Sequence, residues 1–581
     1  MRARLLLSAG LASLACPVAA HAAAPIMPLS EVQPGMRCTA LSVFQGQAVE
    51  PFDVEILDIV GEGTIGRSQP RLLVRVSGDR IEPSGIGLGF SGSPIFCTGA
   101  DGVSKNAGAI SEGLGNYGDL TVLATPIEQV IGTPVTGPRG KTSRREAQRD
   151  TALLARAEPI AAPLSLGGLA PSLMRNLRAA GARHDVALLP APSIPGDSAA
   201  TLPMEPGSAM GVGLSSGDIT LSGIGTVSYV DGNKLWAYGH QFDAAGARSL
   251  LLQDAYVSTI ISNPVQADGY VSYKLAGPVH DRGTISNDGF DAVAGTLGGL
   301  PPRIGVRVVA RDTDLDVRRV LDVNVADEAE VDNPTGYTAL SLVAPIAVSQ
   351  ASTEIFNSAP QRMAGRMCMR VELRELKAPL RFCNRYVSDG TGFGETLSLN
   401  PVALSAGTDA SSALSIFDAY KGEPVHVTDV SARVRQTRAQ RQAYIRNVTL
   451  PKTVRRGETV PVKMVTRVVR GPVRVFSFDW KVPGRLELGK RRLDIRGTDP
   501  DGGFSFFDEL IIEFGGGGTY IDSEGPRSVE ALAAQFAGMN RWDGVRVRKA
   551  GRFFRDETFR IAGRDVVNVR VKRRAGAPAR G

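Results

Sequence analysis

The segment Ser84–Cys97, SGIGLGFSGSPIFC, largely decides how the chain is interpreted, because it joins two β-rich stretches through a glycine-rich turn around Ser91. A serine flanked by glycines in a tight turn exposes its hydroxyl, and nearby backbone N–H groups are left to face a developing oxyanion. This is the local geometry that an acyl-transfer nucleophile needs. Most turns of this composition are only turns, so the motif needs support from elsewhere in the chain.

The remaining sequence indicates a mainly β protein with several domains. Its 581 residues exceed what one ordinary hydrophobic core supports, and its 66 glycines and 36 prolines imply many turns. Runs that alternate apolar and polar residues, or that are rich in Val and Ile, recur along the chain, whereas long amphipathic helical patterns are scarce.

Shifts in composition predict six segments. They are a signal peptide over 1–22, a β-rich unit with Ser91 over 34–136, an Ala/Pro/Arg-rich linker with one helix over 137–205, a second β unit with His240 over 206–311, a β-rich continuation with a cysteine hairpin over 312–420, and a β-sandwich-like region over 421–581.

The N-terminus is typical of a secretory signal. Arg2 and Arg4 precede an apolar run, and small residues flank a cleavage point after Ala22. Lipidation at Cys16 is a weaker alternative, because the residues before it fit a lipobox poorly. No later run is apolar for about 18 residues, so we expect no membrane span after processing. The expected location is the periplasm or cell envelope, with secretion as the alternative.

Four cysteines remain after removal of the signal, an even number that suggests two disulfides in an exported protein. The sequence-local pairing is Cys38–Cys97 and Cys368–Cys383, the second within a hairpin. A zinc site is disfavoured, because no Cys-x-x-Cys pair or histidine cluster accompanies the thiols. We expect neither a metal nor a cofactor.

The net charge is +7, and the basic residues gather in three separate clusters rather than one stripe. Such clusters are usually solvated surface. Contact with an anionic envelope surface is the sharper hypothesis. Nucleic-acid binding is not expected, because the chain has no recognisable binding module for it.

Two of the five histidines are candidate general bases. His240 follows a predicted strand end and a glycine, so its ring has room to accept a proton from a serine hydroxyl. A hydrogen-bonded structural histidine is the plain alternative. His280 is a weaker candidate, because Asp281 and Arg282 beside it suit a surface turn.

Together these segments resemble the SpoIVB-type peptidases, family S55 of the chymotrypsin-like serine proteases. GFSGSPI (Gly89–Ile95) is similar to that family's GMSGSPI serine segment, and GIGTVSYVDGNKLWAYGHQF (Gly223–Phe242) is similar to its histidine segment. The resemblance covers about residues 34–136 and 206–310. It implies two chymotrypsin-like β-barrel halves with an active site between them. The order of the halves is inverted here, with the serine half first, and triads of one geometry occur in several chain orders.

By this resemblance Ser91 is the nucleophile, His240 is the general base, and the N–H groups of Gly89 and Ser91 form the oxyanion hole. Ser93 is the alternative nucleophile, although Pro94 fixes its turn. The nearest match to the family's aspartate is Asp79, with a shorter spacing to the serine. Chymotrypsin-like geometry instead places the acid on the histidine half, which favours Asp254 or Asp281.

The expected function is therefore that of an exported serine endopeptidase that acts on a protein or peptide substrate in the bacterial cell envelope. The resemblance implies limited, regulatory cleavage, including self-cleavage in the linker 137–205. Two alternatives stay open. One is a catalytically inactive envelope protein that uses the same fold as a binding scaffold. The other is an esterase that uses the same residues on envelope polymers.

Overall fold

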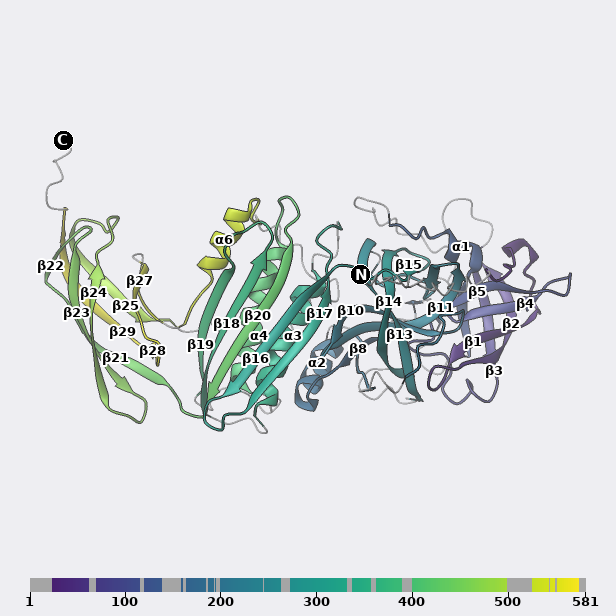
Figure 1. The fold of residues 1–581 in the computed structure, drawn as a ribbon, viewed down its shortest axis with the longest axis horizontal. Coiled ribbons are helices and arrows are strands. Elements are labelled where there is room, and N and C mark those ends of the chain that lie inside the picture. Colours follow the sequence, from purple (N-terminus) through teal and green to yellow (C-terminus); the bar gives the residue numbers. More distant parts are fainter. Residues whose placement is uncertain are drawn as a thin grey trace, which may run out of the picture.

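The computed structural model describes most of the chain, and the expected signal segment 1–22 lies outside the described residues. The described ranges are 23–61, 69–114, 120–137, 158–159, 163–183, 186–192, 194, 199–243, 245–262, 272–331, 337–356, 362–388, 400–498, 525–542, 544–548 and 551–573. These residues form a mainly β molecule, in which two barrels, a helix-covered sheet and a sandwich follow one another along the long axis (Figure 1).

The first barrel, called here the serine barrel, has six strands. They are β1 (Arg37–Val43), β2 (Val49–Val60), β3 (Arg71–Ser77), β4 (Pro94–Thr98), β5 (Ser104–Gly113) and β6 (Thr121–Pro126). The pairing order β1-β2-β3-β6-β5-β4 returns from β4 to β1, so the sheet closes on itself. A short helix, α1 (Ile127–Gly132), follows Pro126, which is its N-cap residue. The 3-10 turn η1 (Leu29–Glu31) precedes β1, and β7 (Glu158–Pro159) pairs with β5.

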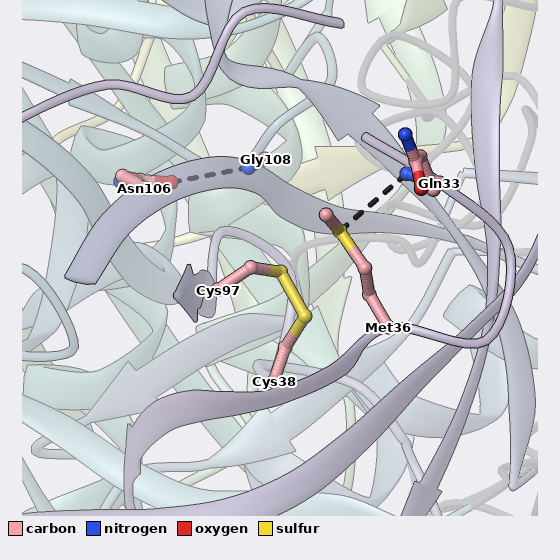
Figure 2. Close-up of a disulfide and its surroundings, with 6 residues drawn as sticks. All are labelled: Gln33, Met36, Cys38, Cys97, Asn106 and Gly108. Carbon is pink, nitrogen blue, oxygen red and sulfur yellow. Dashed lines mark hydrogen bonds between the residues drawn. A yellow bond between two sulfur atoms is a disulfide. The ribbon is translucent and has the colours of Figure 1, made fainter. Parts of the chain in front are cut away.

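The predicted Cys38–Cys97 disulfide is confirmed and closes this barrel. The two cysteines stand directly opposite each other where β1 pairs with β4. Figure 2 shows the disulfide bridging the two strands, close to Met36 and to Asn106 of β5. The Asn106 side-chain oxygen accepts the Gly108 N–H at 3.1 Å, and its amide group donates to the Ser228 carbonyl of the next barrel. The disulfide thus holds β1 to β4, and the buried Asn106 links this part of the serine barrel to the next barrel.

The second barrel, called here the histidine barrel, also has six strands. They are β10 (Ala209–Gly217), β11 (Thr220–Asp231), β12 (Lys234–Ala237), β13 (Gly246–Ile261), β14 (Tyr273–Asp288) and β15 (Val293–Leu297). The pairing order β10-β13-β14-β15-β12-β11 returns from β11 to β10. Within the predicted linker, α2 (Pro171–Arg183) is the expected helix, and β8 (Leu164–Gly167) and β9 (Leu188–Pro190) extend the sheet beyond β11. That part of the linker therefore belongs to the histidine barrel.

The next unit, called here the central sheet, continues the sheet of the histidine barrel through β10 and β17. Its strands are β16 (Arg303–Asp312), β17 (Arg318–Ala326), β18 (Met363–Leu373), β19 (Leu380–Ser388) and β20 (Val427–Thr437), in the order β17-β16-β20-β18-β19. The predicted Cys368–Cys383 disulfide joins β18 and β19. Two helices, α3 (Ala339–Glu354) and α4 (Pro401–Asp418), lie against one face (Figure 1).

The β-rich continuation expected over 312–420 also contains two helices that the sequence analysis did not predict, α3 and α4. All residues of α3 except Glu354 are buried, so its sequence has no polar face to give the helical period. The expected boundary at 421 also shifts, because β20 belongs to the central sheet.

The C-terminal strands form the predicted sandwich from about residue 442. One sheet contains β21 (Gln442–Thr449), β23 (Thr459–Val468), β24 (Val473–Lys481) and β28 (Arg560–Ala562). The other contains β22 (Thr453–Arg455), β25 (Gly489–Gly497), β26 (Gly544–Val547), β27 (Gly551–Arg555) and β29 (Arg564–Lys572). Apolar residues of both sheets form one core that is separate from the cores of the other units. Before β26, the helix α6 (Val529–Gly538) packs against the central sheet instead.

Candidate active site between the barrels

The serine turn is held in a conformation that depends on its glycines. Gly89 and Gly92 have φ of 91° and 92°, a region that side chains with a Cβ rarely adopt. A Cβ on Gly92 would lie 2.0 Å from the Thr226 carbonyl oxygen of the histidine barrel. The turn is therefore built for close contact between the two barrels, and Ser91 is 0% exposed within that contact.

His240 follows β12 through a second strained turn. Tyr238, which is not a glycine, has φ of 72°, and Gly239 has φ of 68°. Such left-handed residues cost about 1–3 kcal/mol when a Cβ is present and are enriched at functional sites. The His240 side chain is buried, and its Nδ1 lies 2.5 Å from the Gln241 carbonyl oxygen. A carbonyl only accepts, so Nδ1 carries the hydrogen and Nε2 is the basic nitrogen of the neutral ring.

One residue of β11, Thr226, connects the serine and histidine turns. Its N–H donates to the Ser91 carbonyl at 2.9 Å, and its own carbonyl accepts the Tyr238 N–H at 3.2 Å. From the serine barrel, the Thr125 hydroxyl donates to the Gly239 carbonyl at 2.7 Å. The structure thus brings the two turns that the sequence singles out against the same point of the barrel interface.

The Ser91 hydroxyl has no hydrogen-bond partner among the described residues, so no Ser91–His240 hydrogen bond is formed. A buried hydroxyl without a partner loses its bonds to water without replacement, which typically costs about 1–3 kcal/mol. The N–H groups of Gly89 and Ser91 likewise donate to no acceptor in the described part of the chain. Three polar groups of this turn are therefore available for a ligand or a reacting group.

The hydroxyl of Ser93, the alternative nucleophile, already takes part in hydrogen bonds within the serine barrel. It donates to the Phe90 carbonyl at 2.7 Å and lies 3.2 Å from the Ser42 hydroxyl. These contacts close the serine turn from inside the barrel. Ser93 is consequently a structural residue of the turn, and Ser91 is the better candidate for chemistry.

None of the three candidate aspartates bonds to His240. Asp79 is exposed in the turn after β3 and makes no ion pair or side-chain hydrogen bond among the described residues. Asp254 instead binds His280, accepting its backbone N–H at 2.8 Å and lying 3.1 Å from its Nδ1. Asp281 accepts bonds from Ser216 and Gln253. Asp254 and His280 thus form a pair of their own.

Asp288, at the end of β14, is a site residue that the sequence analysis missed. Its carboxylate accepts the N–H groups of Phe242 and Asp243, both at 2.7 Å, and of Ala245 at 3.2 Å. Burial raises the pKa of Asp288 to about 6, and the charge of Asp243 adds to the effect. The loop that follows His240 is therefore wrapped around this carboxylate. Only the pairing of β14 with β13 brings Asp288 there, so no local motif could have revealed it.

Lys274 of β14 is the second residue that the sequence did not reveal. Its Nζ donates to the Ser42 hydroxyl at 2.7 Å and to the Thr226 hydroxyl at 3.2 Å, and lies 4.5 Å from the centre of the Phe90 ring. Complete burial lowers the pKa of Lys274 to about 7. No carboxylate pairs with it in the described ranges. An ionisable amine therefore lies beside the serine turn, at the centre of the barrel interface.

The described residues contain no group of three or more His, Cys, Asp or Glu side chains placed to hold a metal. A search of the same residues for a helix long and apolar enough to cross a membrane found none. A cavity of about 390 Å³ is lined by residues of both barrels, including Thr133 and Asp288, but by neither Ser91 nor His240. The serine turn is thus closed off in this conformation.

Comparisons of the chain with models of protein families, with curated proteins and with solved structures found no match, so the function has to be inferred from the site itself.

Proposed function

We propose that the chain is an exported serine endopeptidase of SpoIVB type, with Ser91 as nucleophile and His240 as general base, held closed in this conformation. The observation that carries the proposal is that Thr226 bridges the two turns by backbone hydrogen bonds. Beside this bridge lies the buried Ser91 hydroxyl, which has no hydrogen-bond partner among the described residues. Disulfides favour a compartment outside the cytoplasm. The resemblance of the two segments supplies the reaction class.

In this mechanism the Gln241 carbonyl takes the orienting role that an aspartate has in other triads. It holds the Nδ1 hydrogen of His240, so that Nε2 removes the Ser91 proton as the hydroxyl attacks a peptide carbonyl. His240 then returns that proton to the leaving amine. The N–H groups of Gly89 and Ser91 stabilise the oxyanion, since neither has another acceptor among the described residues.

A closed serine implies that the enzyme is latent, because a peptide cannot reach a residue that is 0% exposed. Activity then requires the barrels to separate at the serine turn. Regulatory proteolysis, which the resemblance implies, fits an enzyme that opens only on a signal.

Fluorophosphonate labelling tests this proposal. Wild-type protein, S91A, H240A and the matched control S93A are labelled in buffer and in urea below the unfolding transition, where the interface opens first. We expect labelling of wild type and S93A that increases with urea, and none of S91A or H240A. Labelling that persists in S91A assigns the nucleophile elsewhere. A wild-type protein that stays unlabelled under all these conditions overturns the proposal.

The second candidate is a non-catalytic binding protein on the same fold. It is favoured by the complete burial of Ser91 and by the absence of the Ser91–His240 hydrogen bond. The same labelling experiment separates the candidates. An esterase would label as the peptidase does, so cleavage of casein and of p-nitrophenyl acetate by the labelled preparation distinguishes those two.

A further inference from the structure

The face of the central sheet that α3 and α4 leave uncovered carries five arginines in a row. Each stands directly opposite the next across adjacent strands, and we call the row the arginine ladder. Its members are Arg318 on β17, Arg311 on β16, Arg435 on β20, Arg366 on β18 and Arg385 on β19. Because neighbouring strands lie about 4.8 Å apart, the ladder extends about 19 Å across the sheet.

Such a row works against the stability of the sheet. Like charges directly opposite each other on paired strands repel and are destabilising. Arg311 is relieved by an ion pair with Asp316. Arg318, Arg435 and Arg366 have no carboxylate partner among the described residues, and Arg318 and Arg435 are exposed. The fold therefore maintains a repulsive row in which, among the described residues, Asp316 is the one carboxylate paired with a member.

Two features distinguish the ladder from scattered surface charges. A hollow of about 350 Å³ is lined by its first three members, Arg318, Arg311 and Arg435, and continues along β16 and β20 to Arg307 and Arg433. At the other end, Arg385 is buried and donates to the backbone carbonyl oxygens of Glu557 and Thr558, which fixes that end against the sandwich. The ladder is thus hollowed over its first three members and anchored at its last.

The side chains point to the chemistry of the ligand. The ladder contains only arginines, whose planar guanidinium groups bind carboxylates through two parallel hydrogen bonds. The ladder positions recur about every 4.8 Å in a straight line, a regular row that suits a linear polymer with charges at short intervals. An extended acidic peptide would present same-side carboxylates about 6.8 Å apart, two residues at about 3.4 Å each.

We propose that the arginine ladder binds a linear polysaccharide that carries carboxylate groups, laid across the strands along the row of arginines. The two disulfides favour a compartment outside the cytoplasm, where acidic glycans occur and nucleic acids are not the usual partners. The proposal does not depend on Ser91, since the ladder lies on a different sheet face from the barrel interface.

The test measures binding of the full-length chain to polygalacturonate by calorimetry at low salt. The ladder variant is R318Q/R435Q/R366Q, and the matched control is R446Q/R467Q/R492Q, which removes three exposed arginines from the sandwich. We expect the ladder variant to bind at least about tenfold more weakly, since each charge-assisted pair contributes strongly. The control should bind within about twofold of wild type, and salt should weaken the wild-type interaction.

Equal losses in both variants, or none in the ladder variant, overturn the proposal. Vesicles of anionic phospholipid or inorganic polyphosphate that displace polygalacturonate at lower concentration assign the site to another polyanion and overturn it too. A second readout covers folding. Without polymer, the ladder variant should melt at a higher temperature than wild type, because repulsion is removed. A lower melting temperature would mean that the ladder is structural.

Discussion

At the scale of single residues, the candidate site depends on backbone groups and on a side chain from a neighbouring strand as much as on Ser91 and His240. The group that contacts Nδ1 of His240 is the backbone carbonyl of Gln241 rather than Asp79, and a backbone carbonyl leaves no signature in sequence. Lys274 was equally hidden, because it enters the site from the middle of an ordinary strand.

Gly92 offers a direct test of the close barrel contact. In G92A the new Cβ would lie 2.0 Å from the Thr226 carbonyl oxygen, on a backbone with φ of 92°. We expect a loss of more than about 3 kcal/mol in the free energy of unfolding, from clash and strain together. G35A is the control, because Gly35 has φ of 85° but nothing within 4 Å of its Cβ. It should lose only about 1–2 kcal/mol. Urea unfolding measures both, and equal losses would contradict the close contact.

Lys274 should make stability depend on pH. Its pKa is lowered to about 7 in the folded protein, whereas an unfolded lysine has a pKa near 10.4. Between these values the unfolded chain binds more protons, so the stability contributed by this site rises with pH, by up to about 1.4 kcal/mol per unit. Below pH 7 both states are protonated and the site's contribution is constant. The difference in unfolding free energy between wild type and K274M should therefore rise from pH 7.5 to 9.5. A difference that stays flat argues against a neutral buried amine.

At the scale of elements, the sequence predicted a helix where residues close together in the chain determine it. The helix at Pro171–Arg183 has an amphipathic pattern, so the sequence predicted a helix in the linker. Helix α3 was missed because burial on all sides removes its period. The arginine ladder could not be predicted either, since two local strand pairs become one row only through β20, which pairs with β18 and, more than 100 residues away in the chain, with β16.

The two disulfides close loops of different length and should therefore contribute differently to the free energy of unfolding. The loops they close correspond to sequence separations of 59 for Cys38–Cys97 and 15 for Cys368–Cys383. Chain entropy assigns about 4 kcal/mol to the first and about 3 kcal/mol to the second. We expect C38A/C97A to lower the unfolding free energy of the serine barrel by about 1 kcal/mol more than C368A/C383A lowers that of the central sheet. Urea titrations followed for each unit compare the two, and a larger loss from the hairpin would contradict the entropic account.

At the scale of the whole molecule, the sheets divide the chain into units whose boundaries differ from those that the composition suggested. The histidine barrel and the central sheet share thirteen strands in one continuous sheet, and apolar residues of both fall in one core. The sandwich has its own core and its own two sheets. Although composition suggested a break near residue 312, hydrogen bonding between β10 and β17 removes it. The barrel and the central sheet should therefore unfold together, and the sandwich separately.

Core substitutions can test this division, because each should act on one transition only. Trp480 is 4% exposed in the sandwich core and packs on Phe553, and Leu251 is buried in the shared core. W480A should cost about 3–5 kcal/mol, and L251A about 2–5 kcal/mol. Calorimetry of the full chain should resolve separate transitions. We expect W480A to lower the temperature of the sandwich transition and to leave the other in place, and L251A to do the reverse. If both variants shift one common transition, the contacts of α6 with the central sheet couple the sandwich to the rest of the molecule, and the chain unfolds as one unit.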